Sequence, residues 1–344
     1  MAGQIQSVYQ KVLITIASVA YDVSASVESA QFRIVANSNS ELVARFTTPS
    51  LPSGIVPDIG TLITLEIWGS FFPNDKFRSG NCYVTECVTD GYYFDLRAVP
   101  FDISKIVIPG DGVTPTTLTN NTLRMLADAA KTALAIPATG ISADAVNVYI
   151  GTVVSGAATQ VTASIDRPYL EALYDWSSKL AYYAYCWRNA LYCVDFLEDY
   201  GSLSAPVYKF SDCIESRVSF GNIADSKVFR NIYRLPAATA VYSIPWVRFG
   251  KIQDMASEGH YYNSKAGQRR AYGLALQSAG AAQSVAIEIS GTVNDNLRPG
   301  KRFDLGDGFF NRIKGAYIIT EITHSISTRE GWKISIRGIK AYTF

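Results

Sequence analysis

The 344-residue sequence has few charged residues and almost no excess of either sign. Asp, Glu, Lys and Arg make up 18% of the chain, against roughly 25% in an average soluble protein. The net charge of +1 provides no global field to recruit nucleic acid or an anionic membrane surface. The 21 Tyr and 16 Phe favour burial of much of the surface against other proteins, because such interfaces gather aromatic residues and exclude Lys and Glu. A hydrophobic binding cleft is the alternative interpretation.

Residues that build metal and redox sites are also scarce. The two histidines, His260 and His324, belong to no His-x-x-x-His or Cys-x-x-Cys pattern, so we predict no metal and expect both to be structural or interfacial. Cys82 and Cys87 lie an odd number of positions apart in one expected strand, so we expect them to face opposite sides. Without a bulge they could not then share a metal or a disulfide. We therefore expect the five cysteines to be free thiols, as in a reducing compartment.

Motifs of enzyme chemistry are missing as well. The sequence has no Gly-x-Ser-x-Gly elbow, and Gly300-Lys301 lacks the rest of a phosphate-binding loop. Asp304, Asp307 and Gly308 suggest a β-turn, because the alternating oxygen ligands of a calcium loop are absent. We predict no cofactor and no catalytic residue.

One pair of carboxylates, Glu86 and Glu321, merits a test as a glycosidase pair, which needs two carboxyl groups about 5 to 10 Å apart. They occupy the same place in two similar segments, so we expect them to be far apart. Their expected partners are Arg97 and Arg337, across a hairpin in each segment.

Long apolar runs are absent too. None approaches the roughly 18 residues that a membrane-spanning helix needs. Lys11 followed by the run from Val12 to Ala20 imitates a signal peptide, but Thr15 and Ser18 interrupt the run and β-branched residues dominate it. We expect a first strand there and no stable membrane association.

The sequence does contain one β-strand pattern that occurs twice. The segment from Gly80 to Glu86 returns as Gly315 to Glu321, and each copy leads into a second matched strand. Those second strands are Gly91 to Arg97 and Gly331 to Arg337, and the later hairpin has a longer loop. Chance similarity of two alternating hairpins is the alternative. A duplication without a shared acid, base or metal ligand indicates architecture rather than chemistry.

Alternating apolar residues and turn signals predict strands on both sides of a different middle segment. We predict a first tube-like β-barrel over 1–110, an α+β insert over 111–215 and a second tube-like β-barrel over 216–344. The strands expected in the first are Val12 to Ala17, Gln31 to Ala36, Glu41 to Thr47, Thr61 to Trp68, Cys82 to Val88 and Tyr92 to Val99. Those expected in the last are Arg230 to Leu235, Val241 to Trp246, Ser284 to Ile289, Lys301 to Leu305, Ala316 to Thr323 and Lys333 to Gly338.

The middle segment has helical periodicity. One helix is predicted from Leu118 to Leu134, and a second begins at Asp166 and Pro168. A hairpin follows, from Tyr183 to Phe196, with Arg188-Asn189 as its turn. Further along, 250–268 is a long functional loop or an approach to a short helix at 268–277.

This order of elements resembles the bacteriophage tail baseplate hub proteins of the late-control-D family, relatives of the hub part of VgrG in type VI secretion. The stretches that carry the resemblance are Tyr169 to Tyr185, Leu297 to Phe303 and Tyr317 to His324. These are short packing signatures, so no catalytic residue carries over.

The resemblance implies a structural, non-enzymatic homotrimer in the virion, assembled in the bacterial host cytoplasm. Two barrels in each of three chains would form a pseudo-sixfold ring that adapts a hexameric tail tube to a trimeric central spike. Other baseplate proteins would surround it, and DNA would pass transiently through the lumen. Alternatives are a hub of a type VI-like secretion or tailocin particle, a secreted glycan-binding β protein and a wall-degrading enzyme.

Overall fold

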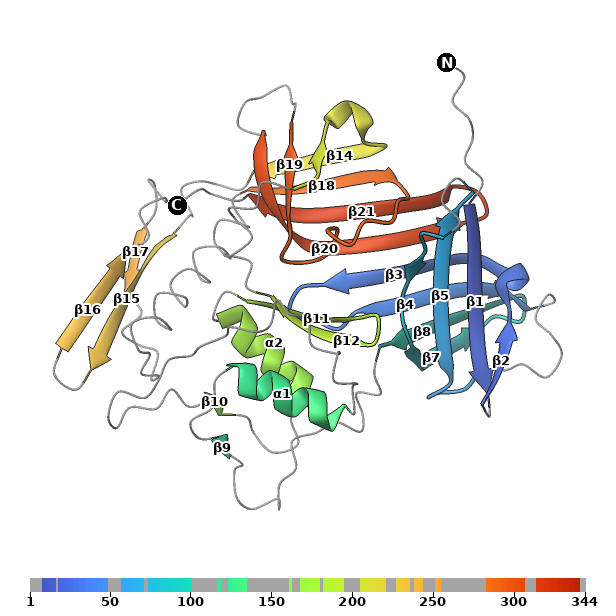
Figure 1. The fold of residues 1–344 in the computed structure, drawn as a ribbon, viewed down its shortest axis with the longest axis horizontal. Helices are drawn as coiled ribbons and strands as arrows, with labels where there is room; N and C mark the ends of the chain where they lie inside the picture. The colour runs from blue at the N-terminus through green and yellow to red at the C-terminus, as the bar shows by residue number, and fades with distance from the viewer. Residues whose placement is uncertain are drawn as a thin grey trace.

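The computed structural model describes residues 8–16, 18–48, 57–70, 74–100, 117–118, 123–134, 161–162, 168–179, 182–194, 205–220, 227–235, 238–243, 251–254, 283–306 and 314–340. Over these residues the protein consists mainly of antiparallel β-sheet, with two α-helices beside the sheet (Figure 1). The mainly β fold class predicted from the sequence is confirmed.

One large sheet joins both ends of the sequence. Its strands follow the order β14-β18-β21-β20-β3-β4-β8-β7-β5-β1-β2, with β6 beside β5, and with β19 linking β13 to β20. The bounds are β1 Val8–Ile16, β2 Val19–Asp22, β3 Val27–Val35, β4 Glu41–Thr47, β5 Leu62–Gly69, β6 Phe77–Arg78, β7 Cys82–Thr89, β8 Tyr93–Val99, β13 Val207–Tyr208, β14 Glu215–Phe220, β18 Gln283–Ser290, β19 Arg302–Leu305, β20 Gly315–Ser327 and β21 Gly331–Lys340.

The strands form because their apolar residues alternate. In β5, for example, Ile63, Leu65 and Ile67 are buried while their neighbours are partly exposed. The side-chain period of two places each such set on one face, where the sheets bury a common core. All six strands predicted before residue 110 are present, with ends shifted by a few residues, whereas the short strands β2 and β6 were not predicted.

The middle segment forms two helices and a hairpin. Helix α1 (Leu123–Ala133) packs on α2 (Tyr169–Lys179), and the hairpin of β11 (Tyr183–Trp187) and β12 (Ala190–Val194) has the predicted Arg188-Asn189 turn. Both turn residues have positive φ, at 50° and 59°, as a tight two-residue hairpin turn requires. The predicted start of the first helix at Leu118 is wrong, because Thr117–Leu118 is the strand β9, paired with β10 (Val161–Thr162).

Three further strands form a sheet of their own. They are β15 (Lys227–Leu235), β16 (Ala238–Ser243) and β17 (Lys251–Asp254), with β15 in the centre. The strand β17 lies where the sequence predicted the start of a long loop. Four residues with only a short apolar pattern gave too weak a signal. The predicted helix at 268–277 and His260 lie outside the described residues.

The two predicted copies of the hairpin match in their irregularities. The register between β7 and β8 shifts at Thr85, and the register between β20 and β21 shifts at the corresponding Thr320. Each threonine hydroxyl then donates a hydrogen bond across the hairpin, to the Arg97 carbonyl at 3.4 Å and to the Arg337 carbonyl at 3.3 Å. A bulge is a specific local device, so the same one at corresponding positions supports duplication over chance alternation.

The turns that precede the two hairpins also match. Gly60 and Gly300 both have φ of +85°, a conformation that favours glycine. The Gly60 amide donates to the Val84 carbonyl at 2.8 Å, and the Gly300 amide donates to the Ile319 carbonyl at 2.9 Å. These partners correspond in the repeat, which extends the match beyond the hairpins.

Candidate functional site

Each hairpin copy belongs to a group of strands in the large sheet, and from here on first copy means β1–β8 with their connections and second copy means β13, β14 and β18–β21 with theirs. The two copies meet edge to edge in the middle of the large sheet. Strand β3 from the first copy pairs antiparallel with β20 from the second, from Ser29 opposite Ser327 to Val35 opposite Glu321. We call this pairing the seam. In Figure 1 it lies between the blue and the red strands, so segments from opposite ends of the chain lie side by side. The sequence patterns predicted both copies but gave no sign of how they join.

A row of alternating charges crosses the seam on the partly exposed face of the sheet. Each member is next to a residue of opposite sign on the neighbouring strand, which stabilises antiparallel pairs. Four ion pairs link the row, and the remaining neighbours, Arg33 and Glu41, are register partners. From β7 to β21 the row is Glu86, Arg97, Glu41, Arg33, Glu321 and Arg337.

The strongest link of the row is at the seam itself. Arg33 Nε and Nη2 donate to the two carboxylate oxygens of Glu321, both at 2.9 Å. This hydrogen bonding raises the pKa of Arg33. The Glu321 side chain is 14% exposed, whereas that of Glu86 is 53% exposed and lies 3.6 Å from Arg97. A bidentate, more buried pair stabilises more than an exposed one, so the seam pair contributes most.

The predicted roles of Glu86 and Glu321 are therefore confirmed, with one addition. Each contacts its predicted arginine, since Glu321 lies 3.7 Å from Arg337. The sequence did not predict Arg33 as the closer partner of Glu321, because that contact joins residues 288 positions apart. Four strand spacings separate β7 from β20, or about 19 Å, well beyond a glycosidase pair.

A groove of about 490 Å³ lies on this face beside the row, lined by residues of β3, β4, β7, β8, β20 and β21. Its charged groups are already paired. Arg45 Nε and Nη2 bind the two oxygens of Asp95 at 2.7 Å, which lowers the pKa of the Asp95 carboxyl. Lys333 lies 3.1 Å from Glu288 and 3.2 Å from Glu330. The charged residues that line the groove are therefore members of ion pairs.

On the buried side, the seam is supported by the hairpin of β11 and β12. Its Tyr185, Trp187 and Val194 belong to the core of the large sheet, whereas its opposite face packs on the two helices. The turn after β3 contacts the same hairpin. The Asn37 side chain accepts from the Ala184 amide at 2.8 Å and donates to the Tyr182 carbonyl at 3.0 Å. The hairpin is thus a layer between the large sheet and the helices.

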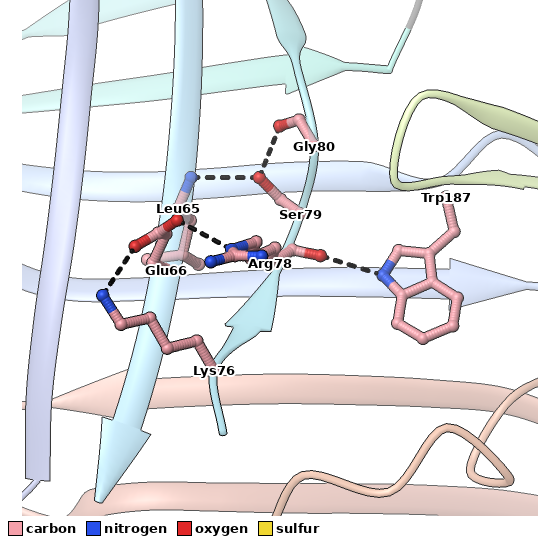
Figure 2. Close-up of polar contacts among 7 residues, drawn as sticks. All are labelled: Leu65, Glu66, Lys76, Arg78, Ser79, Gly80 and Trp187. Atoms are coloured by element: carbon pink, nitrogen blue, oxygen red, sulfur yellow. Dashed lines mark hydrogen bonds and ion pairs between the residues drawn. The ribbon is translucent and has the colours of Figure 1, made fainter. Parts of the chain in front are cut away.

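Figure 2 shows how the hairpin meets the first copy. The Trp187 indole N–H donates to the Arg78 carbonyl at 3.0 Å. Next to it, the Ser79 hydroxyl accepts from the Leu65 amide at 3.0 Å and donates to the Gly80 carbonyl at 2.7 Å. These bonds satisfy polar groups at the edge of β5 and β6 that would otherwise be buried without partners.

The same close-up shows Glu66 between two cations. Its carboxylate binds Lys76 at 3.4 Å and Arg78 at 2.9 Å (Figure 2). The Lys76 ammonium also lies 4.5 Å from the centre of the Trp68 ring. These contacts are partly exposed, and the Glu66–Arg78 ion pair joins register partners on β5 and β6.

The turn of the hairpin reaches both copies. The Arg188 amide donates to the Ser79 carbonyl of the first copy at 3.2 Å, and Arg188 Nη2 lies 2.9 Å from Asp295 of the second. Gly80, with φ of +79°, fits against this turn because it has no side chain. A Cβ there would lie 2.7 Å from the Asn189 amide nitrogen and 2.8 Å from Arg188 Cα.

His324 lies directly beneath the seam. It is 4% exposed, its ring stacks on Phe77 of the first copy with 3.8 Å between centroids, and its Nδ1 has no hydrogen-bond partner among the described residues. Burial, with a smaller effect from Arg188, lowers its pKa to about 3. The ring is therefore neutral at pH 7, and the prediction that His324 is structural is confirmed.

The cysteines show one wrong prediction. The bulge at Thr85 inserts an extra residue, so Cys87 pairs with buried Leu96 and packs against the same core as Cys82. The two do not face opposite sides. All five cysteines are nevertheless thiols rather than disulfides, as predicted, and burial raises the pKa of Cys82 to about 12.

Other positions singled out in the sequence have structural contacts. Lys301 continues the turn at Gly300, and its carbonyl accepts from the Ile319 amide at 2.9 Å. Asp304 binds Arg302 through both oxygens at 2.8 and 2.9 Å, whereas Asp307 and Gly308 lie outside the described residues. No group of three or more potential metal ligands gathers in the described ranges. Neither described helix has the length and hydrophobicity of a membrane span.

Comparison with known proteins relates this fold to phage tails. No protein-family model and no curated protein matches the sequence. The fold is similar to the 43 kDa tail protein of prophage MuSo2 from Shewanella oneidensis, with a TM-score of 0.65 and 13% identity over 96% of this chain and 97% of that one.

Two other solved structures are also similar. A tail protein from Neisseria meningitidis gives a TM-score of 0.62 at 12% identity, covering 96% of both chains. A type VI secretion component from E. coli, itself described as similar to bacteriophage T4 tail proteins, gives 0.51 at 9% identity, covering 92% of this chain and 74% of that one. The chain therefore has the fold of phage tail proteins and of a type VI secretion component.

Proposed function

We propose that this protein is a structural baseplate hub of a phage tail. It acts as a homotrimer whose pseudo-sixfold ring adapts a hexameric tail tube to a trimeric central spike. The observation that carries this proposal is the duplicated hairpin, with matching bulges at Thr85 and Thr320, in a fold similar to tail proteins. A duplicated unit lets three chains present six similar surfaces, which a ring of six tube subunits can match.

The proposed organisation follows the boundaries expected from the sequence: a first barrel over 1–110, an insert over 111–215 and a second barrel over 216–344. Its partners are further copies of itself, the tail tube protein, the central spike protein and other baseplate proteins, with DNA passing transiently through the lumen. The proposed location is the tail baseplate of the virion, assembled in the host cytoplasm. The low charge content and the paired charges beside the seam support a role in assembly rather than in binding a charged ligand.

Light scattering of the purified chain at micromolar concentration tests this proposal. We expect the mass of three chains, and we expect images down the particle axis to show six similar lobes with threefold symmetry between chains. A chain that stays monomeric both alone and with its spike protein would overturn the proposal.

We propose that this protein has no enzymatic activity. Glu86 and Glu321 form ion pairs on separate hairpins, and the groove beside the row, which Glu86 lines and Glu321 does not, contains paired charges. We expect the protein to leave peptidoglycan intact in a zymogram. Clearing that is lost in Glu86→Gln or Glu321→Gln would instead establish a wall-degrading enzyme.

A hub of a secretion or tailocin particle is the second candidate. The similarity to a type VI secretion component, and to a structure of a Francisella PdpA-VgrG complex with a TM-score of 0.53 and 10% identity, favours it. That match covers 99% of this chain and 60% of the other. Purified particles that contain this chain decide between the candidates, because phage particles package DNA whereas tailocin and secretion particles do not.

A further inference from the structure

The large sheet contains two corresponding sets of four strands. Pairing within the hairpins matches β7 to β20 and β8 to β21, and the next strand outward matches β4 to β18. The outermost strand of each set is then β3 in the first copy and β14 in the second. In Figure 1 these strands are stacked in one layer, from β14 at one limit to β7 at the other.

Each set of four strands has two edge strands, and the seam joins one edge strand of each set. It joins β3, the outer strand of the first set, to β20, the inner strand of the second. The corresponding strands are β14 and β7. Over the described residues, β14 pairs only with β18, and β7 beyond Val84 pairs only with β8. The sheet continues from the start of β7 into β5, but over the described residues β14 and the part of β7 after Val84 each leave one edge without a strand neighbour, and each of these edges corresponds to one side of the seam.

The registers fix which residues would meet if these edges joined as the seam does. In the first copy, Gln31 pairs with Val43, which pairs with Arg97. In the second, Arg217 pairs with Ala286, which pairs with Arg337. Since Arg97 corresponds to Arg337, Arg217 corresponds to Gln31.

The other side of the seam is mapped in the same way. Gln31 lies opposite Ser325, four positions after Glu321, and the residue four positions after Glu86 is Asp90, the first residue of the turn that follows β7. Arg217 of one chain is thereby placed opposite Asp90 of the other. Two residues along, Ser219 is placed opposite Val88.

The side chains on the two edges suit this pairing. Arg217 and Asp90 are both exposed and have opposite charges, and opposite charges in register stabilise antiparallel strands. A large apolar side chain is exposed on β7, Val88 at 55%, and another immediately before β14, Ile214 at 52%. An exposed strand edge with apolar side chains is a template for pairing with another strand. The occupant with the matching pattern is a second copy of this chain.

We propose that β14 of one chain pairs antiparallel with β7 of the next, in the register that places Arg217 opposite Asp90, so that three chains close into one continuous ring. This inference rests on the proposed trimeric hub and names the surfaces that build it. The contact is head to tail, because β14 and β7 are different surfaces of the same chain, and such contacts close into a ring when the rotation per chain divides a full turn.

Engineered cysteines in the full chain test the register. Ser219→Cys combined with Val88→Cys places two thiols opposite each other, and mild oxidation should convert the protein to covalent dimers and trimers on a non-reducing gel. Glu215→Cys combined with Val88→Cys is the matched control, because it offsets the thiols by four residues, or about 13 Å, and should cross-link at least tenfold less. The single-cysteine variants report the background from native Cys87 and Cys213.

Substitutions of the charge pair provide a second test, which does not depend on engineered cysteines. Asp90→Asn keeps the side-chain oxygen that accepts the Tyr92 and Tyr93 amides, so the hairpin turn should fold. We expect Asp90→Asn and Arg217→Gln each to weaken association about two- to fivefold per contact, and the double variant to be no weaker than either. Arg329→Gln, another exposed arginine, should leave association unchanged.

The outcomes separate this proposal from the function it rests on. A trimer that cross-links equally through both cysteine pairs, or through neither, overturns the β14–β7 register while the hub proposal stands. Independent, additive effects of the two charge variants count against the register in the same way. A protein that is monomeric with and without its spike overturns both proposals.

Discussion

Replacing Gly80 by alanine should be among the more damaging single-methyl additions to this fold. Gly80 has φ of +79°, and an added Cβ would lie 2.7 Å from the Asn189 amide nitrogen and 2.8 Å from Arg188 Cα. Both contacts are with backbone, so no side chain can rotate away. The strained backbone conformation costs about 1 to 2 kcal/mol, and forced overpacking adds about 1 to 3 kcal/mol. We expect a total loss of about 2 to 5 kcal/mol.

Gly60→Ala is the matched control. Gly60 has φ of +85°, and nothing lies within 4 Å of a Cβ built there, so this variant has the backbone cost of about 1 to 2 kcal/mol alone. Urea denaturation followed by tryptophan fluorescence measures both losses. Hydrogen exchange of the Arg188 amide, bound to the Ser79 carbonyl, reports whether the hairpin turn moves away. Equal losses in the two variants would refute the close fit of the hairpin against Gly80.

Three more predictions concern the seam and the layer beneath it. Burial lowers the pKa of His324 from 6.5 to about 3, so between these pH values the folded state binds fewer protons than the unfolded state. The free energy of unfolding is therefore at its full value above pH 6.5 and declines as the pH falls toward 3, by up to about 5 kcal/mol. Urea midpoints measured across that range should fall with pH, and His324→Phe should flatten the slope. Glu321→Gln should lower the free energy of unfolding by about 1 to 3 kcal/mol, and Glu86→Gln should lower it by under about 1 kcal/mol. If chemical denaturation gave the larger loss for Glu86→Gln, the seam pair would not be the stronger one. Trp187→Phe should lower the free energy of unfolding by about 1 to 3 kcal/mol, because it removes the hydrogen bond to the Arg78 carbonyl. The loss is measurable as a lower melting temperature.

The sequence predicted most clearly what local patterns determine. The β11–β12 hairpin was located together with its turn because Arg188-Asn189 interrupts two apolar strands. The ion pairs of Glu86 and Glu321 were predicted because each partner lies on the other strand of the same hairpin. In both cases neighbouring residues contain the whole signal.

The features that were missed depend on contacts between distant residues or on single-residue irregularities. Nothing near Arg33 indicates that it binds Glu321, because the β3–β20 pairing is set by the packing of the whole sheet. The bulge at Thr85 reverses the face on which Cys87 lies, and simple alternation cannot show it. Strands of two to four residues, such as β6 and β17, contain too few residues to establish a period.

The position of the seam has a consequence for synthesis on the ribosome. Arg33 and Glu321 are 288 residues apart, so at about 5 to 20 residues per second strand β3 emerges roughly 15 to 60 seconds before the strand that covers its edge. During that interval the nascent protein exposes an unpaired β edge, the feature most prone to aggregation. A ribosome pause or a truncation before β20 should therefore favour insoluble product, which links the yield of intact protein to the speed of translation.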